Sequence, residues 1–421
     1  MKRDGRRQMI ILLVYAIGII LCLWMAWNLG ANDAANPTDC AVGAGVISMK
    51  KAVILFAIFA AIGGILLGPF VMKTIDRGII AKEGLSEGVM ILGSFAAILS
   101  ASLFVAFCTW KGMPTSTTHA IVGGVLGFGL IASPQLVNWD TISVIFVSLV
   151  VSPVLSVLLA FGLFFIFRAY FRKPRKKRTD MILSYILLFT LSFAITLTIC
   201  QKVFEFPYFE SLSITIPSAI ILGIIGTFWL HKKYRASESS ERTEGAGNVK
   251  LMSGLLIIGL CFSAFAFGAN DMANATGAFV TPTMAIAGGV PTMEVMIILA
   301  ILGSIGMAVG GLTWGYRVIR TASFRVTRLD PLTGLASEYS NAFVVFLFTV
   351  IPYYLIGFGV PISTTHASIG SIIGVGLASM GFRGVNKRTV GKIILTWGLT
   401  IPIVIILSAV LFGLFTIFIP T

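Results

Sequence analysis

The sequence predicts an all-α, polytopic membrane protein, and two observations support this fold class. Of its 421 residues, 57% are hydrophobic and only 11% are charged, whereas a soluble domain carries roughly 25% charged residues. Several apolar runs also reach the length of about 20 residues that is needed to span a bilayer. Lipid offers no hydrogen-bond partners to the backbone, so such runs are expected to be helices.

The apolar runs predict about 12 transmembrane segments, counting each run as one. The expected full spans are 9–27, 52–72, 141–171, 181–200, 213–231, 251–268, 290–315 and 393–419. Two further segment pairs, 91–110 with 114–132 and 341–359 with 361–380, are expected to be helical hairpins. The sequence leaves open whether these pairs are re-entrant or cross the membrane fully.

The formal net charge of +14 does not indicate nucleic-acid binding, because the basic residues lie in short loops between apolar runs. The loop around 168–178 and three later basic loops fall on one side of the expected span map. The positive-inside rule makes that side cytoplasmic. Both termini and the four basic residues of the N-terminal tail are then outside, in a multi-pass protein of the cell (inner) membrane. We interpret the N-terminal apolar run as a retained first helix.

The cysteines predict neither a disulfide framework nor a zinc site. There are five of them, none forms a CxxC pair, and all lie within or beside apolar runs. Small buried side chains are the simpler interpretation.

Two motifs each occur twice in the same order. Gly30-Ala-Asn-Asp-Ala-Ala-Asn36 matches Gly268-Ala-Asn-Asp-Met-Ala-Asn274, and Pro114-Thr-Ser-Thr-Thr-His-Ala120 matches Pro361-Ile-Ser-Thr-Thr-His-Ala367. An odd number of expected crossings separates equivalent points, which predicts an inverted repeat. We therefore divide the chain into a first repeat (1–172), two linking helices (173–234), a polar cytoplasmic linker (235–250) and a second repeat (251–421).

The first motif predicts a cation site. Asp33 and Asp271 lie at the ends of apolar helices, where a carboxylate is costly and usually functional. Gly30 and Gly268 would allow the helix to break nearby. Hard oxygen ligands suit sodium, with a proton on Asp33 or Asp271 as the alternative. The expected sodium ligands are Asn32, Asp33, Asn36, Asn270, Asp271 and Asn274. Asp39 has no acidic counterpart in the second half and is an asymmetric candidate.

The second motif predicts an anion site. A proline followed by hydroxyl residues is typical of a helix start, where free backbone N–H groups and the helix dipole attract phosphate. The expected phosphate-binding residues are Ser116, Thr117, Thr118, Ser363, Thr364 and Thr365, with Asn36 and Asn274. His119 and His366 are expected to be structural, with a proton relay as the alternative.

No Lys or Arg lies within the four motifs. A phosphate beside Asp33 and Asp271 would therefore face strong repulsion in a medium of low dielectric constant. Cotransport of cations is thus a physical requirement of this interpretation.

The duplicated motifs resemble those of the inorganic phosphate transporter (PiT) family, and the resemblance covers both halves of the chain. It implies symport of phosphate with sodium or protons, twelve membrane segments and an inverted repeat. It also implies cation binding at Asp33 and Asp271 and phosphate contact at the Ser-Thr-Thr runs. Asp39 departs from the small residue that relatives often have.

The expected function is a secondary active symporter that imports inorganic phosphate with sodium, or protons, by alternating access. A cation-coupled sulfate permease is the alternative cargo, and a channel is a second class. The protein is not expected to be an enzyme, because Ser, His and Asp occur without a nucleophile elbow. No cofactor is expected, and the partners are phosphate, sodium and the lipid bilayer. The sequence gives neither stoichiometry nor affinity, and it leaves open whether the protein forms a homodimer.

Overall fold

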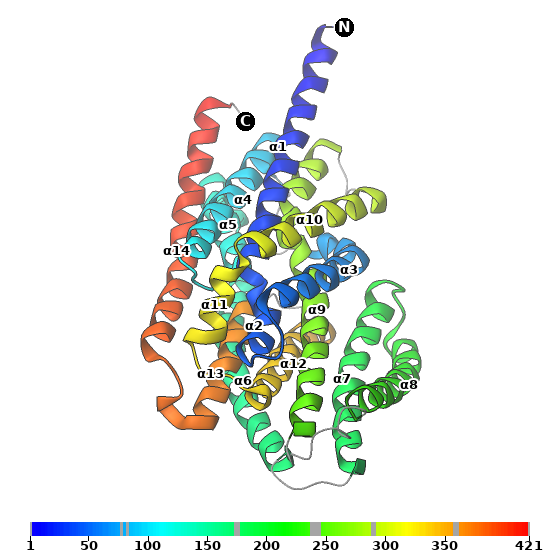
Figure 1. The fold of residues 1–421 in the computed structure, drawn as a ribbon. Helices are drawn as coiled ribbons and strands as arrows, with labels where there is room; N and C mark the ends of the chain where they lie inside the picture. Colours follow the sequence, from blue (N-terminus) through cyan, green and yellow to red (C-terminus); the bar gives the residue numbers. More distant parts are fainter. Residues whose placement is uncertain are drawn as a thin grey trace.

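The computed structural model describes residues 2–75, 79–80, 84–171, 177–235, 246–287, 292–356 and 362–419. These residues form a bundle of helices (Figure 1) with two isolated β-bridges, Ile80 with Val137 and Thr327 with Val385, and no longer strand among them. In chain order the elements are α1 (Lys2–Asp33), α2 (Ala35–Gly43), α3 (Met49–Ile75), α4 (Glu87–Trp110), α5 (Thr117–Ala132), η1 (Pro134–Leu136), α6 (Trp139–Phe171), α7 (Lys177–Lys202), α8 (Tyr208–Arg235), α9 (Ala246–Ala287), α10 (Met293–Thr313), α11 (Gly315–Arg325), α12 (Pro331–Ile356), α13 (Thr364–Met380), η3 (Gly381–Arg383) and α14 (Lys387–Phe418).

Ten helical stretches among the described residues are long and apolar enough to cross a membrane. The all-α, polytopic fold class is therefore confirmed, and most expected spans coincide with a helix. Two differences stand out. Helix α9 extends through 42 residues, well beyond the expected end at 268. Helix α11 lies in a segment that we expected to be a basic loop.

Helix α11 escaped prediction because it is amphipathic and short. Val318, Ile319 and Ala322 are fully buried, whereas Arg320 and Arg325 are exposed. A search for long apolar runs misses this helix because charged residues interrupt the run. Its apolar residues nevertheless recur at the helical spacing of three and four residues.

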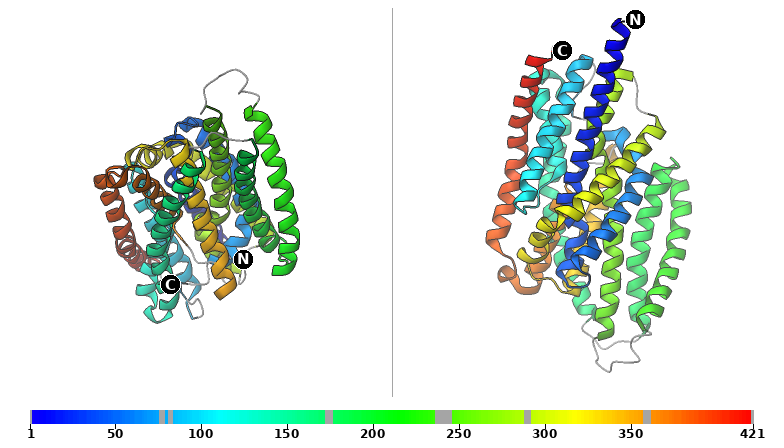
Figure 2. Two further views of the ribbon diagram at one scale, coloured as in Figure 1. Left: turned by 90° about the horizontal axis from the view of Figure 1, so that it is seen from below. Right: turned by 45° about the horizontal axis from the view of Figure 1, so that its top comes forward.

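The two chain ends lie at the same end of the molecule. Figure 1 shows both at the top, whereas α6 ends and α9 begins at the bottom. Helices α7 and α8 pack against each other at the edge of the bundle in both views of Figure 2. The basic loop at 172–176, Pro361 and residues 236–245 of the predicted linker lie outside the described residues.

Helices α4 and α5 form the first of the two expected hairpins. They pack side by side in the upper half of Figure 1, with the break between them at residues 111–116. Helix α5 has 16 residues, which extend about 24 Å at 1.5 Å per residue. The hydrocarbon core is about 30 Å thick. The length of α5 therefore favours the re-entrant form over a full crossing.

Glycines bring helices of the two sequence halves into backbone contact. A Cβ atom on Gly30 would lie 1.8 Å from the carbonyl oxygen of Met307, so only glycine allows α1 to approach α10 this closely. A Cβ atom on Gly268 would likewise lie 1.9 Å from the carbonyl oxygen of Ala60, where α9 meets α3. Helix α1 of the first half thus packs on α10 of the second half, and α9 of the second half packs on α3 of the first half.

The hairpin helices α5 and α13 likewise each pack on a helix of the other half. Gly127 of α5 faces the backbone of Ile405 in α14, and Gly374 of α13 faces the backbone of Val157 in α6. These matched contacts agree with two related halves, and the inverted relationship stays a prediction.

Candidate ion-binding site

Asp33 lies at the point where the duplicated motifs meet. It is the last residue of α1 and is fully buried. Thr117 at the start of α5 donates to its Oδ2 at 2.7 Å, and Thr365 near the start of α13 lies 3.2 Å from its Oδ1. One carboxylate therefore lies within hydrogen-bond distance of a hydroxyl from each Ser-Thr-Thr run.

The first helix is interrupted just after Asp33. Helix α1 ends at Asp33 and α2 begins at Ala35, so the interruption lies at Ala34, four residues after Gly30, and Gly30 itself lies within α1. Helix α9 similarly continues through Gly268 without a break. Both glycines allow neighbouring helices to pack closely. The backbone carbonyl groups next to them remain part of the helices.

Asn32 holds the first hairpin. Its Nδ2 donates to Thr109 Oγ1 at 2.9 Å and to the carbonyl oxygen of Met113 at 3.2 Å, and its Oδ1 accepts from the backbone N–H of Thr115 at 3.1 Å. These bonds fix the backbone between α4 and α5, which places Thr117 against Asp33. The amide thus positions the hairpin, and its role as a sodium ligand stays a prediction.

Asn36 contacts the second hairpin. Its Nδ2 donates to Thr364 Oγ1 and to Thr365 Oγ1, both at 3.1 Å. Both amide hydrogens are therefore used, and the hydroxyls of α13 are held beside Asp33. The first-half motif Asn32-Asp33-x-x-Asn36 thus contacts both hairpins.

One carboxylate oxygen of the second-half motif has no hydrogen-bond partner. Asn274 Nδ2 donates to Asp271 Oδ1 at 2.8 Å and reaches Thr118 Oγ1 at 3.4 Å. Asp271 Oδ2 is buried without a hydrogen-bond partner. An unpartnered carboxylate oxygen inside a protein is costly, and a cation is one ligand that would satisfy it.

The carboxyl groups of Asp33 and Asp271 are close enough for their charges to interact. The partners of Asp33 are hydroxyl and amide groups, with no Lys or Arg among them. Lys111, the basic residue nearest to a motif in the sequence, is exposed and lies 4.2 Å from the ring of Trp110. The site is therefore rich in oxygen and negative charge.

Ser116 and Ser363 are N-cap residues. The Oγ of Ser116 accepts from the backbone N–H of His119 at 3.2 Å, and the Oγ of Ser363 accepts from that of His366 at 3.1 Å. Capping leaves each hydroxyl hydrogen available to an anion, and the first-turn N–H groups of α5 and α13 have no intrahelical acceptors. The predicted anion-binding role is compatible with this geometry.

The two motif histidines form a buried contact. Their rings meet edge to face with centroids 4.6 Å apart, and His366 also stacks on Trp397 at 3.8 Å. His366 Nδ1 lies 3.3 Å from the carbonyl oxygen of Leu149. These contacts join α5, α13, α14 and α6, which agrees with a structural role.

A cavity of about 70 Å³ reaches the site. Its polar lining includes Asn36, Asn270 and Thr364, and apolar residues of α7, α9 and α12 line most of the remainder. Asn270 therefore lies at this cavity, within reach of the same α2 and α13 residues.

Sequence reasoning missed a second buried acidic cluster. Asp39, the asymmetric candidate, lies beside Cys40 and Glu338. Glu338 has no partner motif and lies near the start of an apolar helix, so its sequence environment gave no signal. Cys40 was interpreted only as a small buried side chain.

Comparison with known proteins agrees with this geometry. Residues 29–408 match the phosphate transporter family. A Pyrococcus abyssi protein named as a phosphate permease is 34% identical over 407 residues, covering 94% of this chain and 96% of that protein. The chloroplastic inorganic phosphate transporter 2-1 of Arabidopsis thaliana is 30% identical, covering 96% of this chain and 72% of that protein.

A solved structure described as the sodium-dependent phosphate transporter has the same fold. The TM-score is 0.87 at 30% sequence identity, and the match covers 97% of this chain and all of that one. The recognition of the family from the duplicated motifs is thereby confirmed: the chain belongs to the phosphate transporter family.

Proposed function

We propose that this protein is a secondary active symporter that imports inorganic phosphate together with sodium. The observation that carries the proposal is the convergence of Thr117 and Thr365, from two helix N-termini, on the carboxylate of Asp33. The structural neighbour is described as a sodium-dependent phosphate transporter, which supports both the cargo and the coupling ion.

The N-termini of α5 and α13 would bind the phosphate. Both helices begin beside Asp33, and their first-turn N–H groups and hydroxyls are donors suited to phosphate oxygens. In this proposal, the phosphate contacts come from Ser116, Thr117, Thr118, Ser363, Thr364 and Thr365. Asn36 and Asn274 lie between this donor set and the aspartates.

Sodium ions would occupy the oxygen-rich side of the site. Asp33 and Asp271 supply the charge, and the open Oδ2 of Asp271 is the first ligand that we assign. A phosphate beside two carboxylates would be repelled by their charges at low dielectric constant. Bound cations remove this repulsion, so each ion raises the affinity for the other.

Transport requires the site to open to each side of the membrane in turn. We place the N- and C-termini outside and the linker 235–250 in the cytoplasm, on the basis of the basic loops. The two halves, 1–172 and 251–421, would form an inverted pair around the site, with the helices of 173–234 beside them. A homodimer is compatible with this arrangement.

Labelled-phosphate uptake into proteoliposomes tests the proposal. An inward sodium gradient should drive uptake above the level of empty liposomes, and unlabelled phosphate should compete better than sulfate. Uptake driven by a proton gradient without sodium would still support phosphate as the cargo. It would assign proton transfer, and not sodium binding, to Asp33 and Asp271. Uptake that sulfate suppresses as well as phosphate does would contradict the assigned cargo.

A further inference from the structure

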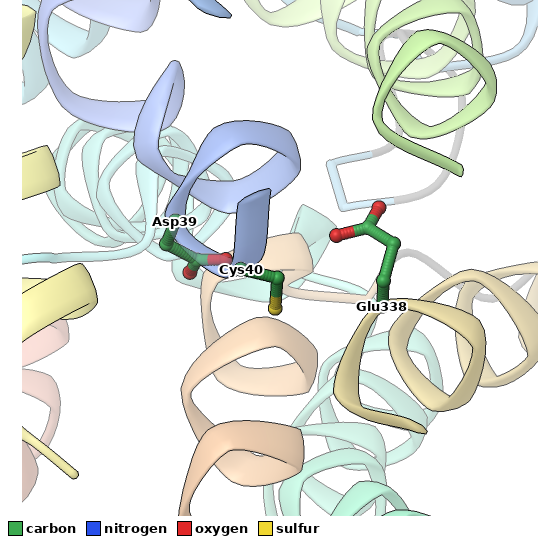
Figure 3. A group of neighbouring side chains, drawn as sticks. All are labelled: Asp39, Cys40 and Glu338. Atoms are coloured by element: carbon green, nitrogen blue, oxygen red, sulfur yellow. The ribbon is translucent and has the colours of Figure 1, made fainter. Parts of the chain in front are cut away.

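A second cluster of chemically reactive side chains lies between α2 and α12. Figure 3 shows the side chains of Asp39 and Cys40 on α2 and that of Glu338 on α12, facing a common space. A carboxylate oxygen of Asp39, the Sγ of Cys40 and a carboxylate oxygen of Glu338 all lie within 4.8 Å of one another. All three residues are at most 1% exposed.

Half of the carboxylate oxygens in this cluster have no partner. Ser368 Oγ donates to Asp39 Oδ2 at 2.5 Å, and Ser263 Oγ donates to Glu338 Oε1. Asp39 Oδ1 and Glu338 Oε2 are buried and accept no hydrogen bond. The serines therefore orient each carboxylate through one oxygen and leave the other oxygen free for a ligand.

The two carboxyl groups need a positive partner whenever they are ionised. The groups that face them are hydroxyls, the Cys40 thiol and the Cys40 backbone N–H, and none of these is cationic. Burying two unpaired carboxylates costs several kcal/mol each, even after the protein relaxes. One divalent cation balances either the two carboxylates or, when Cys40 binds as the thiolate, the thiolate and one carboxylate while the other carboxyl stays protonated.

The sulfur indicates which divalent cations would fit. Zinc binds thiolate sulfur at about 2.3 Å and carboxylate oxygen at about 2.1 Å, so two ligands of one ion lie at most about 4.4 Å apart. The three ligand atoms already lie within 4.8 Å of one another, and small side-chain rotations would complete the site. Calcium and magnesium prefer oxygen ligands alone.

The cluster is separate from the ion-binding site around Asp33 but is connected to it. Asp39 follows Asn36 by one turn of α2, and Ser368 follows Thr365 by about one turn of α13. Ser263 also lines the cavity that reaches Asn36, which gives a route for a small cation toward Glu338. An ion held here would join α2 of the first half to α12 of the second.

We propose that Asp39, Cys40 and Glu338 form a binding site for a thiophilic divalent cation such as Zn²⁺. On binding, the Cys40 S–H bond breaks, the sulfur bonds to the metal, and the proton passes to solvent, while one of the two carboxyl groups stays protonated so that the buried site is neutral. Binding does not depend on the proposed transport function, so failure of one leaves the other standing. Because α2 also carries Asn36, metal occupancy would fix the position of a residue in the ion-binding site.

Cobalt titration of the purified, full-length protein tests the site, since Co²⁺ is a spectroscopic substitute for Zn²⁺. The protein is freed of any metal-binding tag, treated with chelator and titrated in high sodium chloride. We expect one Co²⁺ per chain, a thiolate-to-cobalt charge-transfer band in the near ultraviolet, and loss of the band when Zn²⁺ is added. A site that prefers sodium would show no band, and this result would overturn the proposal.

Variants separate the cluster from other thiols. Cys40→Ser should abolish the charge-transfer band, whereas the matched control Cys22→Ser, at a similarly buried cysteine, should retain it. Asp39→Asn and Glu338→Gln should each weaken Co²⁺ affinity by at least tenfold, by analogy with losses seen even for outer-shell partners. A band that persists in Cys40→Ser, or equal affinity in wild type and Glu338→Gln, would overturn the assignment. Gel filtration and circular dichroism confirm the fold of each variant, and Cys40→Ala provides a second thiol-free variant if Cys40→Ser fails to fold.

Discussion

His119 and His366 meet edge to face, with ring centroids 4.6 Å apart, although 246 intervening residues separate them in the sequence. Each histidine is the third residue of a helix whose N-cap serine accepts its backbone N–H. The pair therefore fixes the relative position of the two helix N-termini that carry the Ser-Thr-Thr runs. His366 lies between His119 and Trp397, so its ring is packed on two sides.

Replacing His366 by Gln should lower thermal stability and the maximal uptake rate together, because the stacked contact with Trp397 and the contact with Leu149 O are lost. The pH dependence of the remaining uptake should match that of the wild type. A changed pH profile with unchanged stability would instead support the proton-relay alternative. His231, which lies in α8 away from the motifs, provides the control as His231→Gln.

Asp33→Asn and Asp271→Asn should each remove most sodium dependence of phosphate uptake, since each substitution deletes a buried negative charge from the proposed cation site. The measurement is the initial uptake rate against sodium concentration. Asp140→Asn, at an exposed position near the start of α6, should behave like wild type. Wild-type sodium dependence in both aspartate variants would remove them from the cation site.

Thr117→Val should raise the sodium concentration needed for half-maximal uptake. The substitution preserves side-chain shape but removes the 2.7 Å hydrogen bond to Asp33 Oδ2. A bond to a charged group contributes about 1.5–3 kcal/mol, which corresponds to roughly tenfold to a hundredfold in affinity if binding depends on it. Thr190→Val, which removes only a bond to a backbone carbonyl of its own helix, should have no such effect.

Gly30→Ala and Gly268→Ala should each destabilise the protein strongly. The new Cβ atoms would overlap backbone oxygens at 1.8 and 1.9 Å, and the helices would have to separate. Overpacking of this kind typically costs about 1–3 kcal/mol or more. Gly398→Ala in α14 is the matched control, because no atom lies within 4 Å of its added Cβ. The measurement is the melting temperature in detergent, and equal melting temperatures for Gly268→Ala and Gly398→Ala would contradict the packing argument.

Trp397→Phe should cost about 1 kcal/mol, the contribution of a typical hydrogen bond. The indole Nε1 donates to the carbonyl oxygen of Pro114 at 3.2 Å, and Phe keeps a smaller aromatic ring but removes the donor. Trp139→Phe, at an exposed indole, should leave the melting temperature unchanged. A larger loss in Trp139→Phe than in Trp397→Phe would show that the bond to Pro114 contributes little.

The sequence predicted the fold class and most helices because apolar runs longer than the bilayer thickness have few alternatives. It also predicted that Asp33 and the Ser-Thr-Thr runs belong to one site, because both motifs are duplicated. It did not predict that Asn32 would hold the first hairpin, since the partners Thr109, Met113 and Thr115 lie far along the chain. Only the three-dimensional path of α4 brings them to the same amide.

The missed cluster has a similar explanation. Asp39 stood out as an unmatched acid, but Glu338 and Cys40 carried no duplicated pattern and no metal-ligand spacing. A contact between residues that are remote in the sequence produces no periodic pattern from which it could be predicted. The length of α9 was underestimated for a different reason, because its polar motif residues interrupt the apolar pattern while the helix continues.

The glycine contacts between the two halves have a consequence for how the chain is made. The glycine-lined faces of α1 and α5 are covered by α10 and α14, which the ribosome synthesises much later. The first helices therefore enter the membrane without the neighbours that they need, and a newly inserted first half cannot mature by itself. Assembly is thus a late, concerted event, and a chain that stops before α14 would leave the glycine-lined face of α5 unpaired in lipid.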